Sequence, residues 1–236
     1  MTELTVFLII WLAIFTQSFS GFGLALVSMP LLIGVVGLGV ATPLVALVGL
    51  TAEGIILARY RQALNLRAVA LFTAASVVGI PLGVLALRQV SKVIILPVLG
   101  IVVAGYAVYA LLNLRLPRLD GWQWSVGLGV IAGALGGAYN VPGPPVILYG
   151  TARRWPPDEF KSNLQGFFLF NSLLVTAAHA VGGNYTPDVL RAYLVALPAI
   201  ALGALTGFAL AARVDAEHFR QIALVLLIGL GISLIV

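Results

Sequence analysis

The chain has 236 residues, of which 61% are hydrophobic and only 9% are charged, and its mean hydropathy is +1.10. That composition excludes a soluble globular domain and indicates a chain that lies mostly in lipid. The net charge of +5 requires no nucleic-acid partner, because Lys and Arg in a polytopic membrane protein lie near the headgroups and set the topology. Since there is no cysteine, we expect no disulfide and no thiolate metal site, and the sequence indicates neither a metal nor a cofactor.

In chain order, two interrupted apolar regions each precede three uninterrupted apolar runs. The N-terminal MTELTVFLIIW lacks the basic segment of a secretory signal, so we expect it to be retained. A membrane-crossing helix needs about 20 residues, so each run is long enough for one span. Each interrupted region is too long for one span and contains Gly, Ser, Asn or Pro near its middle, which predicts a broken helical hairpin. The predicted elements are a hairpin at 4–37, spans at 40–58, 68–87 and 93–112, a linker at 115–121, a hairpin at 122–150, and spans at 164–181, 192–212 and 219–236.

The two halves of the chain resemble each other. NLRAVALFTAASVVGIPLGVLALRQV aligns without a gap with VLRAYLVALPAIALGALTGFALAARV, and the interrupted regions align at a slightly different offset. The glycines and prolines that match between the halves are Gly79 with Gly203, Gly83 with Gly207, Gly21 with Gly136, and Pro30 with Pro145. We therefore predict a duplication, with the first repeat at 1–114 and the second at 122–236.

The distribution of Lys and Arg favours inverted repeats over parallel ones. If each interrupted region crossed once, the 13 basic residues would divide almost evenly between the two sides. If each region enters and returns to the same side, the division becomes ten against three, the asymmetry expected of an inner-membrane protein. We therefore expect an all-α polytopic protein of the inner or plasma membrane with both termini outside. Ten full spans would give the same division, so charge leaves open whether the hairpins cross completely.

Each break should have a function, because unpaired backbone groups in hydrocarbon cost several kcal/mol each. Such breaks survive where they line a wet cavity, and in inverted-repeat transporters two of them face each other near the midplane. The predicted tips are Gln17–Pro30 and Gly136–Pro145. Pro30 and Pro145 suit the first turn of the returning half-helices, where a missing N–H removes no helical hydrogen bond. The positive ends of two half-helices could then hold an anion without a buried Lys or Arg.

These motifs resemble a known family. SGFGLALVSMPLLI, GVATPLVALVG and GAYNVPGPPVILYG together are similar to the TauE/SafE family of membrane permeases, also called TSUP, over nearly the whole chain. Gly143, Pro144 and Pro145 match the Gly-Pro-Pro element of that family's second repeat, and GFGLALVSMP matches the glycine-rich turn of its first. The resemblance implies a secondary transporter of sulfur-containing anions such as sulfite, thiosulfate or organosulfonates.

Neutral donors and helix-breaking residues near the tips are the candidates for binding this anion, because oxyanion oxygens accept hydrogen bonds from neutral groups as readily as from backbone amides. The candidate substrate-binding residues are Gln17, Ser20, Gly21, Ser28, Pro30, Tyr139, Asn140, Gly143, Pro144 and Asn171. Ser18 belongs to the same tip. Gln165, Asn171, Ser172 and Thr176 form a polar stripe on one predicted helix. The alternative is that these side chains satisfy broken-helix carbonyls or join helices.

Glu53 and His179 are the acid and the histidine within the predicted spans and are candidates for proton coupling, because an idle ionisable group in the membrane is costly. Each also has a structural interpretation. Glu53 could pair with Arg59 at the surface, and His179 could cap a helix just before Gly182.

A passive anion channel and an intramembrane enzyme are the two alternative functional classes. A passive anion channel would share these features and differ in its kinetics. An intramembrane enzyme is less favoured, because the sequence has no H-E-x-x-H, no G-x-S-x-G, no cysteine nucleophile and no pair of intramembrane Asp residues. We therefore expect the partners to be a small anion, the lipid bilayer and a coupling proton. No feature of the sequence assigns an oligomeric state.

Overall fold

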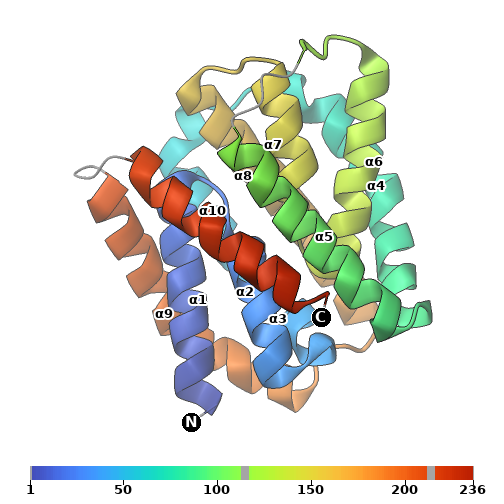
Figure 1. The fold of residues 1–236 in the computed structure, drawn as a ribbon, viewed down its shortest axis with the longest axis vertical. Helices are drawn as coiled ribbons and strands as arrows, with labels where there is room; N and C mark the ends of the chain where they lie inside the picture. The colour runs from blue at the N-terminus through green and yellow to red at the C-terminus, as the bar shows by residue number, and fades with distance from the viewer. Residues whose placement is uncertain (1, 113–116, 212–215, 236) are drawn as a thin grey trace.

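The computed structural model describes residues 2–112, 117–211 and 216–235, and these ranges are helical throughout apart from short connections (Figure 1). The elements are α1 (Thr2–Ser20), α2 (Leu24–Val36), α3 (Leu38–Tyr60), a 3-10 turn η1 (Arg61–Ala63), α4 (Leu66–Gln89), α5 (Lys92–Leu111), α6 (Trp122–Tyr139), α7 (Gly143–Ala152), α8 (Pro157–Val181), α9 (Pro187–Ala211) and α10 (Ala216–Ser233). The prediction of an all-α polytopic membrane protein is confirmed. Within the described ranges, six helices are long and apolar enough to cross a membrane.

Both interrupted regions form pairs of helices. The first becomes α1 and α2 with a break at 21–23, and the second becomes α6 and α7 with a break at 140–142. α1 is itself 19 residues long, which corresponds to about 28 Å, so one arm of this hairpin is nearly a full span. In Figure 1, α1 begins at the lower end of the molecule and α6 at the upper end, so the two pairs enter from opposite ends.

The packing partners follow a pattern that is the same in both halves. The most extensive contacts pair α1 with α9, α4 with α6, α3 with α8, and α5 with α10. Let each helix of α1–α5 be replaced by its counterpart five places later, and the reverse. The α1–α9 pair then becomes the α6–α4 pair, while the α3–α8 and α5–α10 pairs stay the same. Two structurally equivalent halves produce this pattern, which agrees with the predicted duplication; the inverted orientation of the repeats is not tested by it. The repeat boundaries and the orientation in the membrane stay predictions.

Four of the glycines that match between the halves occupy equivalent crossings. Gly79 and Gly83 of α4 face the backbone of α6, and Gly203 and Gly207 of α9 face the backbone of α1. A Cβ atom at any of these positions would collide with a main-chain atom of the facing helix. Small residues let membrane helices approach this closely, and here they attach each long hairpin arm to a helix from the other half.

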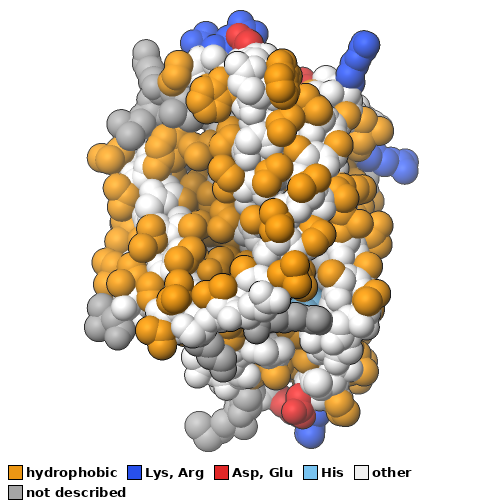
Figure 2. Space-filling model, turned by 90° about the vertical axis from the view of Figure 1, so that its right-hand side faces the viewer, with side chains coloured by type: hydrophobic (Ala, Val, Ile, Leu, Met, Phe, Trp, Pro, Cys, Tyr) orange, Lys and Arg blue, Asp and Glu red, His pale blue; other side chains and the backbone are white. Residues whose placement is uncertain are grey.

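The outer surface of the bundle suits lipid. Large hydrophobic side chains are exposed along α1, α4, α5, α9 and α10. Figure 2 shows them covering most of one face, with Lys, Arg, Asp and Glu gathered mainly near its two ends. This distribution is the one that a polytopic membrane protein requires.

The two basic loops that the charge argument placed on one side lie together. The connection between α3 and α4 contacts the second turn of α8 through the Asn65 amide, which donates to Asn163 Oδ1 at 2.8 Å. The basic residues of these loops therefore share one end of the bundle. Which side of the membrane this end faces stays a prediction.

Candidate functional site

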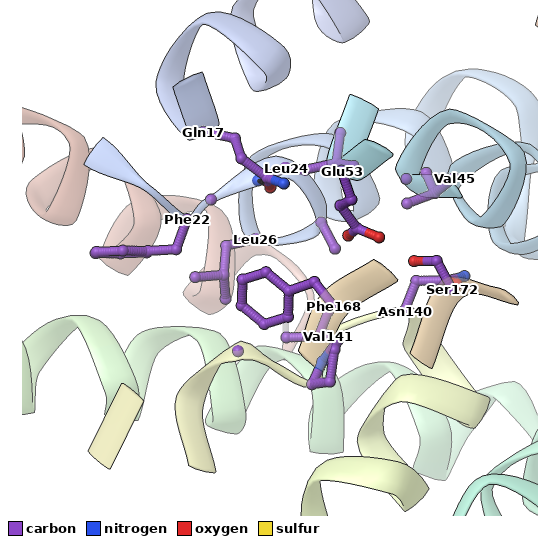
Figure 3. Close-up of a pocket in the computed structure, with 15 residues that line it drawn as sticks. Gln17, Phe22, Leu24, Leu26, Val45, Glu53, Asn140, Val141, Phe168 and Ser172 are labelled. Atoms are coloured by element: carbon purple, nitrogen blue, oxygen red, sulfur yellow. Dashed lines mark hydrogen bonds between the residues drawn. The ribbon is translucent and has the colours of Figure 1, made fainter. Parts of the chain in front are cut away.

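A small cavity of about 30 Å³ lies between the two helix breaks, within about 420 Å³ of unfilled space that includes the part open to solvent. Its wall combines both breaks, the first turns of α2 and α7, and the middle of α3 and α8 (Figure 3). The lining residues are Gln17, Phe22, Gly23, Leu24, Ala25, Leu26, Val45, Gly49, Glu53, Asn140, Val141, Pro142, Gly143, Phe168 and Ser172. Segments about 120 residues apart in the sequence therefore meet at one site.

The first break is shaped by glycine and held by two glutamines. Gly21 and Gly23 have φ angles of 89° and 123°, a region that favours glycine because other L-residues are strained there. Gln17 Oε1 accepts a hydrogen bond from the Leu24 amide at 2.9 Å and so caps the start of α2. Gln165 Nε2 donates to the Gly21 carbonyl at 2.6 Å. Side chains from α1 and α8 therefore form hydrogen bonds with backbone groups that the break leaves without helical partners.

The second break ends α6 at Asn140, which adopts the left-handed conformation with φ of 56°. Its amide donates to the Gly136 carbonyl, which is the αL type of helix end, and the Val141 amide donates to the Leu135 carbonyl. The side chain turns away from this end, and Nδ2 donates to the Thr42 carbonyl of α3 at 2.7 Å. Asn140 therefore both shapes the break and attaches it to α3.

Pro30 and Pro145 were both predicted to lie in the first turn of a returning half-helix, and the structure agrees for only one of them. Pro145 lies in the first turn of α7, as expected. Pro30 lies inside α2, because that helix already begins at Leu24, and the prediction for Pro30 is wrong. A tight turn with positive φ at Gly23 starts α2 without any need for proline. Inside the helix, Pro30 instead leaves the Leu26 carbonyl without its usual helical partner.

The starts of α2 and α7 both open into the cavity, as the sequence predicted for the two tips. Ala25 and Leu26 belong to the first turn of α2, where amides have no intrahelical acceptor, and Gly143 begins α7. Among the described residues that line the cavity, none is Lys or Arg. The positive electrostatic contribution here comes from helix ends and neutral donors.

Glu53 of α3 and Ser172 of α8 lie close together in the cavity wall (Figure 3). Ser172 hydrogen-bonds to the Glu53 carboxylate, whose side chain is buried, and the second oxygen, Oε2, has no partner among the described residues. Gly49 makes this approach possible, because a Cβ there would lie 2.9 Å from Ser172 Oγ. Glu53 therefore does not form the surface pair with Arg59, whose guanidinium lies over the ring of Phe208.

His179 is fully buried but does not line the cavity. Its Nδ1 lies 2.8 Å from Asn184 Nδ2, and its ring packs against that of Tyr185. These contacts tie the end of α8 to the loop that follows. Of the two titratable candidates, the structure brings only Glu53 to the cavity.

Several other candidates serve the backbone or the helix packing and do not line the cavity. Ser20 Oγ lies 2.8 Å from the Thr16 carbonyl and 2.6 Å from that of Phe22, so it is held within the break. Tyr139 donates to the Ile95 carbonyl of α5. The remaining candidates outside the lining are Ser18, Gly21, Ser28, Pro30, Pro144, Asn171 and Thr176. The polar stripe of α8 is thus divided, since Ser172 faces the cavity and Gln165 supports the first break.

The apolar part of the wall was not predicted from the sequence. Val45 and Gly49 precede Glu53 at intervals of four, and Phe168 precedes Ser172 by four, so each set lies on one helix face. That spacing could have extended the site from Glu53 and Ser172 to their neighbours. Nothing in the sequence distinguishes Phe168 itself from the other aromatic residues of the spans.

Comparison with known proteins assigns the family. The model of the family described as "Sulfite exporter TauE/SafE" matches residues 6–234. The chain belongs to the TauE/SafE family. It is 29% identical over 224 residues to a protein of Cupriavidus necator named "Probable sulfite/organosulfonate exporter TauE", with 92% of this chain and 88% of that protein covered. No solved structure gives a significant match. This TauE/SafE chain is therefore a multi-pass membrane protein of a transporter family, and the family resemblance is confirmed.

Proposed function

We propose that the protein is a secondary transporter that moves a small sulfur-containing anion, such as sulfite, thiosulfate or an organosulfonate, across the inner membrane by alternating access. The anion binds in the cavity between the two helix breaks. The observation that carries this proposal is that the starts of α2 and α7 line one cavity that has no lining Lys or Arg. Family membership and the name of the Cupriavidus necator relative support the substrate class.

Helix ends can replace a buried cation in this site. Each helix start carries the equivalent of roughly half a positive charge, so two of them offset much of the charge of a monoanion. Backbone amides at Gly143 and in the first turn of α2 supply hydrogen bonds, and the Gln17 side chain adds a polar contact. A sulfur oxyanion has acceptor oxygens on several sides and can use donors from both breaks at once.

The cavity also has an apolar side that suits an organic substituent. Leu26 of α2, Val45 of α3 and Phe168 of α8 contribute to the lining. A sulfonate group near the two helix starts would leave a short carbon chain beside these residues, so burial of that chain adds affinity. This arrangement favours organosulfonates together with the inorganic anions.

Alternating access follows from the way the cavity is built. Each half contributes one break and one central helix, α3 or α8, so a rocking of one half against the other can open the cavity to either side in turn. The glycine crossings attach α1 to α9 and α6 to α4, so each break moves with a long helix of the other half.

Counterflow in liposomes tests this function. Purified protein is reconstituted with unlabelled sulfite, thiosulfate or a short organosulfonate inside, and uptake of the same labelled anion is followed. We expect saturable uptake that exceeds equilibrium transiently, because a carrier exchanges bound anions. Uptake that neither saturates nor shows counterflow would instead assign a passive channel.

The loop arginines provide a matched control. Arg153 lies outside the cavity and pairs with Asp120 at 3.3 Å, with both side chains partly exposed. Arg153→Gln should leave calorimetric affinity within about twofold of wild type, because partly exposed pairs far from a ligand contribute little. A large loss of affinity in this variant would contradict an anion site built from helix ends.

A further inference from the structure

We propose that Glu53 binds the coupling proton of this transporter, so that one proton accompanies each anion. This inference rests on the proposed function, since it requires the anion to bind in the cavity between the breaks. Glu53 is 6% exposed, lines that cavity and hydrogen-bonds with Ser172, while its Oε2 has no partner among the described residues. A buried acid with an open oxygen therefore shares the cavity with the anion.

Two negative charges in one cavity repel each other strongly. At a separation of about 6 Å and an effective dielectric constant of about 20, the repulsion lowers affinity on the order of a hundredfold. A protonated Glu53 removes this repulsion and offers an O–H donor to the anion, as a neutral carboxylic acid does. Binding of the anion and protonation of Glu53 must therefore favour each other to the same extent, by thermodynamic linkage.

No other described group is placed to neutralise Glu53. None of the other residues that line the cavity is charged or titratable. The helices packed against α3 are α2, α8 and α9, together with η1. α2 has no titratable residue, and those on the other elements are Arg61 of η1, Asp158, Glu159, Lys161 and His179 of α8, and Asp188, Arg191 and Tyr193 of α9. The α8 residues lie at least seven positions from Ser172, and Tyr193 bonds to Thr51 on a different face of α3 from Glu53.

The second half of the chain supports a stoichiometry of one. Glu53 and Ser172 each lie fifteen positions after the first residue of their helices, Leu38 of α3 and Pro157 of α8. α3 and α8 pack against each other, and these two residues meet where the helices line the cavity. One of them carries an acid and the other a hydroxyl, which provides a single proton-binding group for each cycle.

The proton step balances without any other reactant. While the cavity is open to one side, a proton from water adds to a carboxylate oxygen of Glu53 and forms an O–H bond, and the anion binds. After the cavity opens to the other side, the anion leaves, the O–H bond breaks and the proton passes to water there. For a monoanion the complete step moves no net charge.

Proton uptake during binding tests the inference. Anion binding to the purified protein is measured by calorimetry between pH 5 and 8 in buffers of different ionisation enthalpy, which gives the number of protons bound with each anion. Wild type should take up about one proton, with affinity falling up to tenfold per pH unit where Glu53 loses its proton. Glu53→Gln mimics the protonated acid, so it should bind the anion with little pH dependence, take up no proton, and keep counterflow without moving protons.

Two further variants keep the test decisive. Glu3→Gln removes an exposed acid that pairs with Arg191 far from the cavity, and it should behave as wild type. If Glu53→Gln does not fold, Ser172→Ala is used instead. That variant removes a donor to the carboxylate, so the pH at which binding is half lost should rise while proton uptake persists.

The outcomes separate the two proposals. Anion binding by wild type without proton uptake, proton uptake that persists in Glu53→Gln, or a requirement for Na⁺ in its place would overturn the inference and leave the anion site intact. If no sulfur anion binds to wild type at any pH, the proposed function fails, and the role of Glu53 fails with it.

Discussion

Gly143 gives the most direct test of the anion site, because it lines the cavity and has room beside it. It is the first residue of α7. A Cβ atom at this position would lie 3.7 Å from Ile147 Cδ1 and 3.8 Å from Phe168 Cζ, which are ordinary van der Waals distances. Gly143→Ala should therefore fold normally. Gly143→Leu adds three more carbon atoms next to Phe168 and fills the space where the anion would approach the helix start.

The expected loss of affinity follows from the contacts that the leucine blocks. An anion kept from the Gly143 amide loses one hydrogen bond to a charged group, about 1.5–3 kcal/mol. Greater distance from the end of α7 removes about 0.3–1 kcal/mol of helix-dipole interaction. Together these reach about 2–4 kcal/mol, so affinity should fall roughly 30- to 1000-fold. Gly143→Ala keeps the approach open, and its affinity should fall by less than about tenfold.

Calorimetry with the preferred anion and thermal unfolding in detergent separate binding from folding. Gly127→Leu is the matched control, because Gly127 is exposed on α6 and its Cβ would meet no atom within 4 Å. Its affinity and melting temperature should equal those of wild type. Wild-type affinity in a folded Gly143→Leu protein would refute the reasoning and place the anion elsewhere.

Three further predictions concern topology and the supports of the site. Because the chain has no cysteine, single cysteines introduced at Thr2 and Gln62 can be labelled without background. The cysteine at position 2 should react from outside intact cells, and the cysteine at position 62 only after permeabilisation. The reverse pattern would contradict the inverted assignment. Asn140→Gly should lower stability by about 0.5–1.5 kcal/mol through the lost bond to the Thr42 carbonyl, and Asn140→Ala by about 1–2 kcal/mol more because alanine is strained at positive φ. Gly79→Leu should fail to yield folded protein in size-exclusion chromatography, since its side chain meets the backbone of α6; a monodisperse product would show that this crossing can yield.

The helices themselves were predictable because the bilayer imposes a single solution on each apolar run. Backbone groups in hydrocarbon must be paired within the segment, so a run of about 20 apolar residues becomes a helix whatever its neighbours are. The predicted spans 68–87 and 93–112 accordingly appear as Leu66–Gln89 and Lys92–Leu111. Pro30 shows where this reasoning fails. Proline is tolerated inside membrane helices when neighbouring groups compensate, so its position does not by itself report a helix start.

Three features could be read from the sequence alone: the two broken hairpins, the scarcity of charge between the ends of the bundle, and a short set of candidates that included Gln17, Asn140, Gly143 and Glu53. Glycine and proline limit the backbone locally, and polar residues are too costly in lipid to lie there unpaired, so these features can be read without coordinates. Which polar side chains face the cavity could not be read in this way and depends on the three-dimensional packing. Ser20 turns to backbone carbonyls, whereas Ser172 and Glu53 meet between α3 and α8. That choice depends on how each helix is rotated and where it crosses its neighbours, which long-range packing decides and local spacing does not encode.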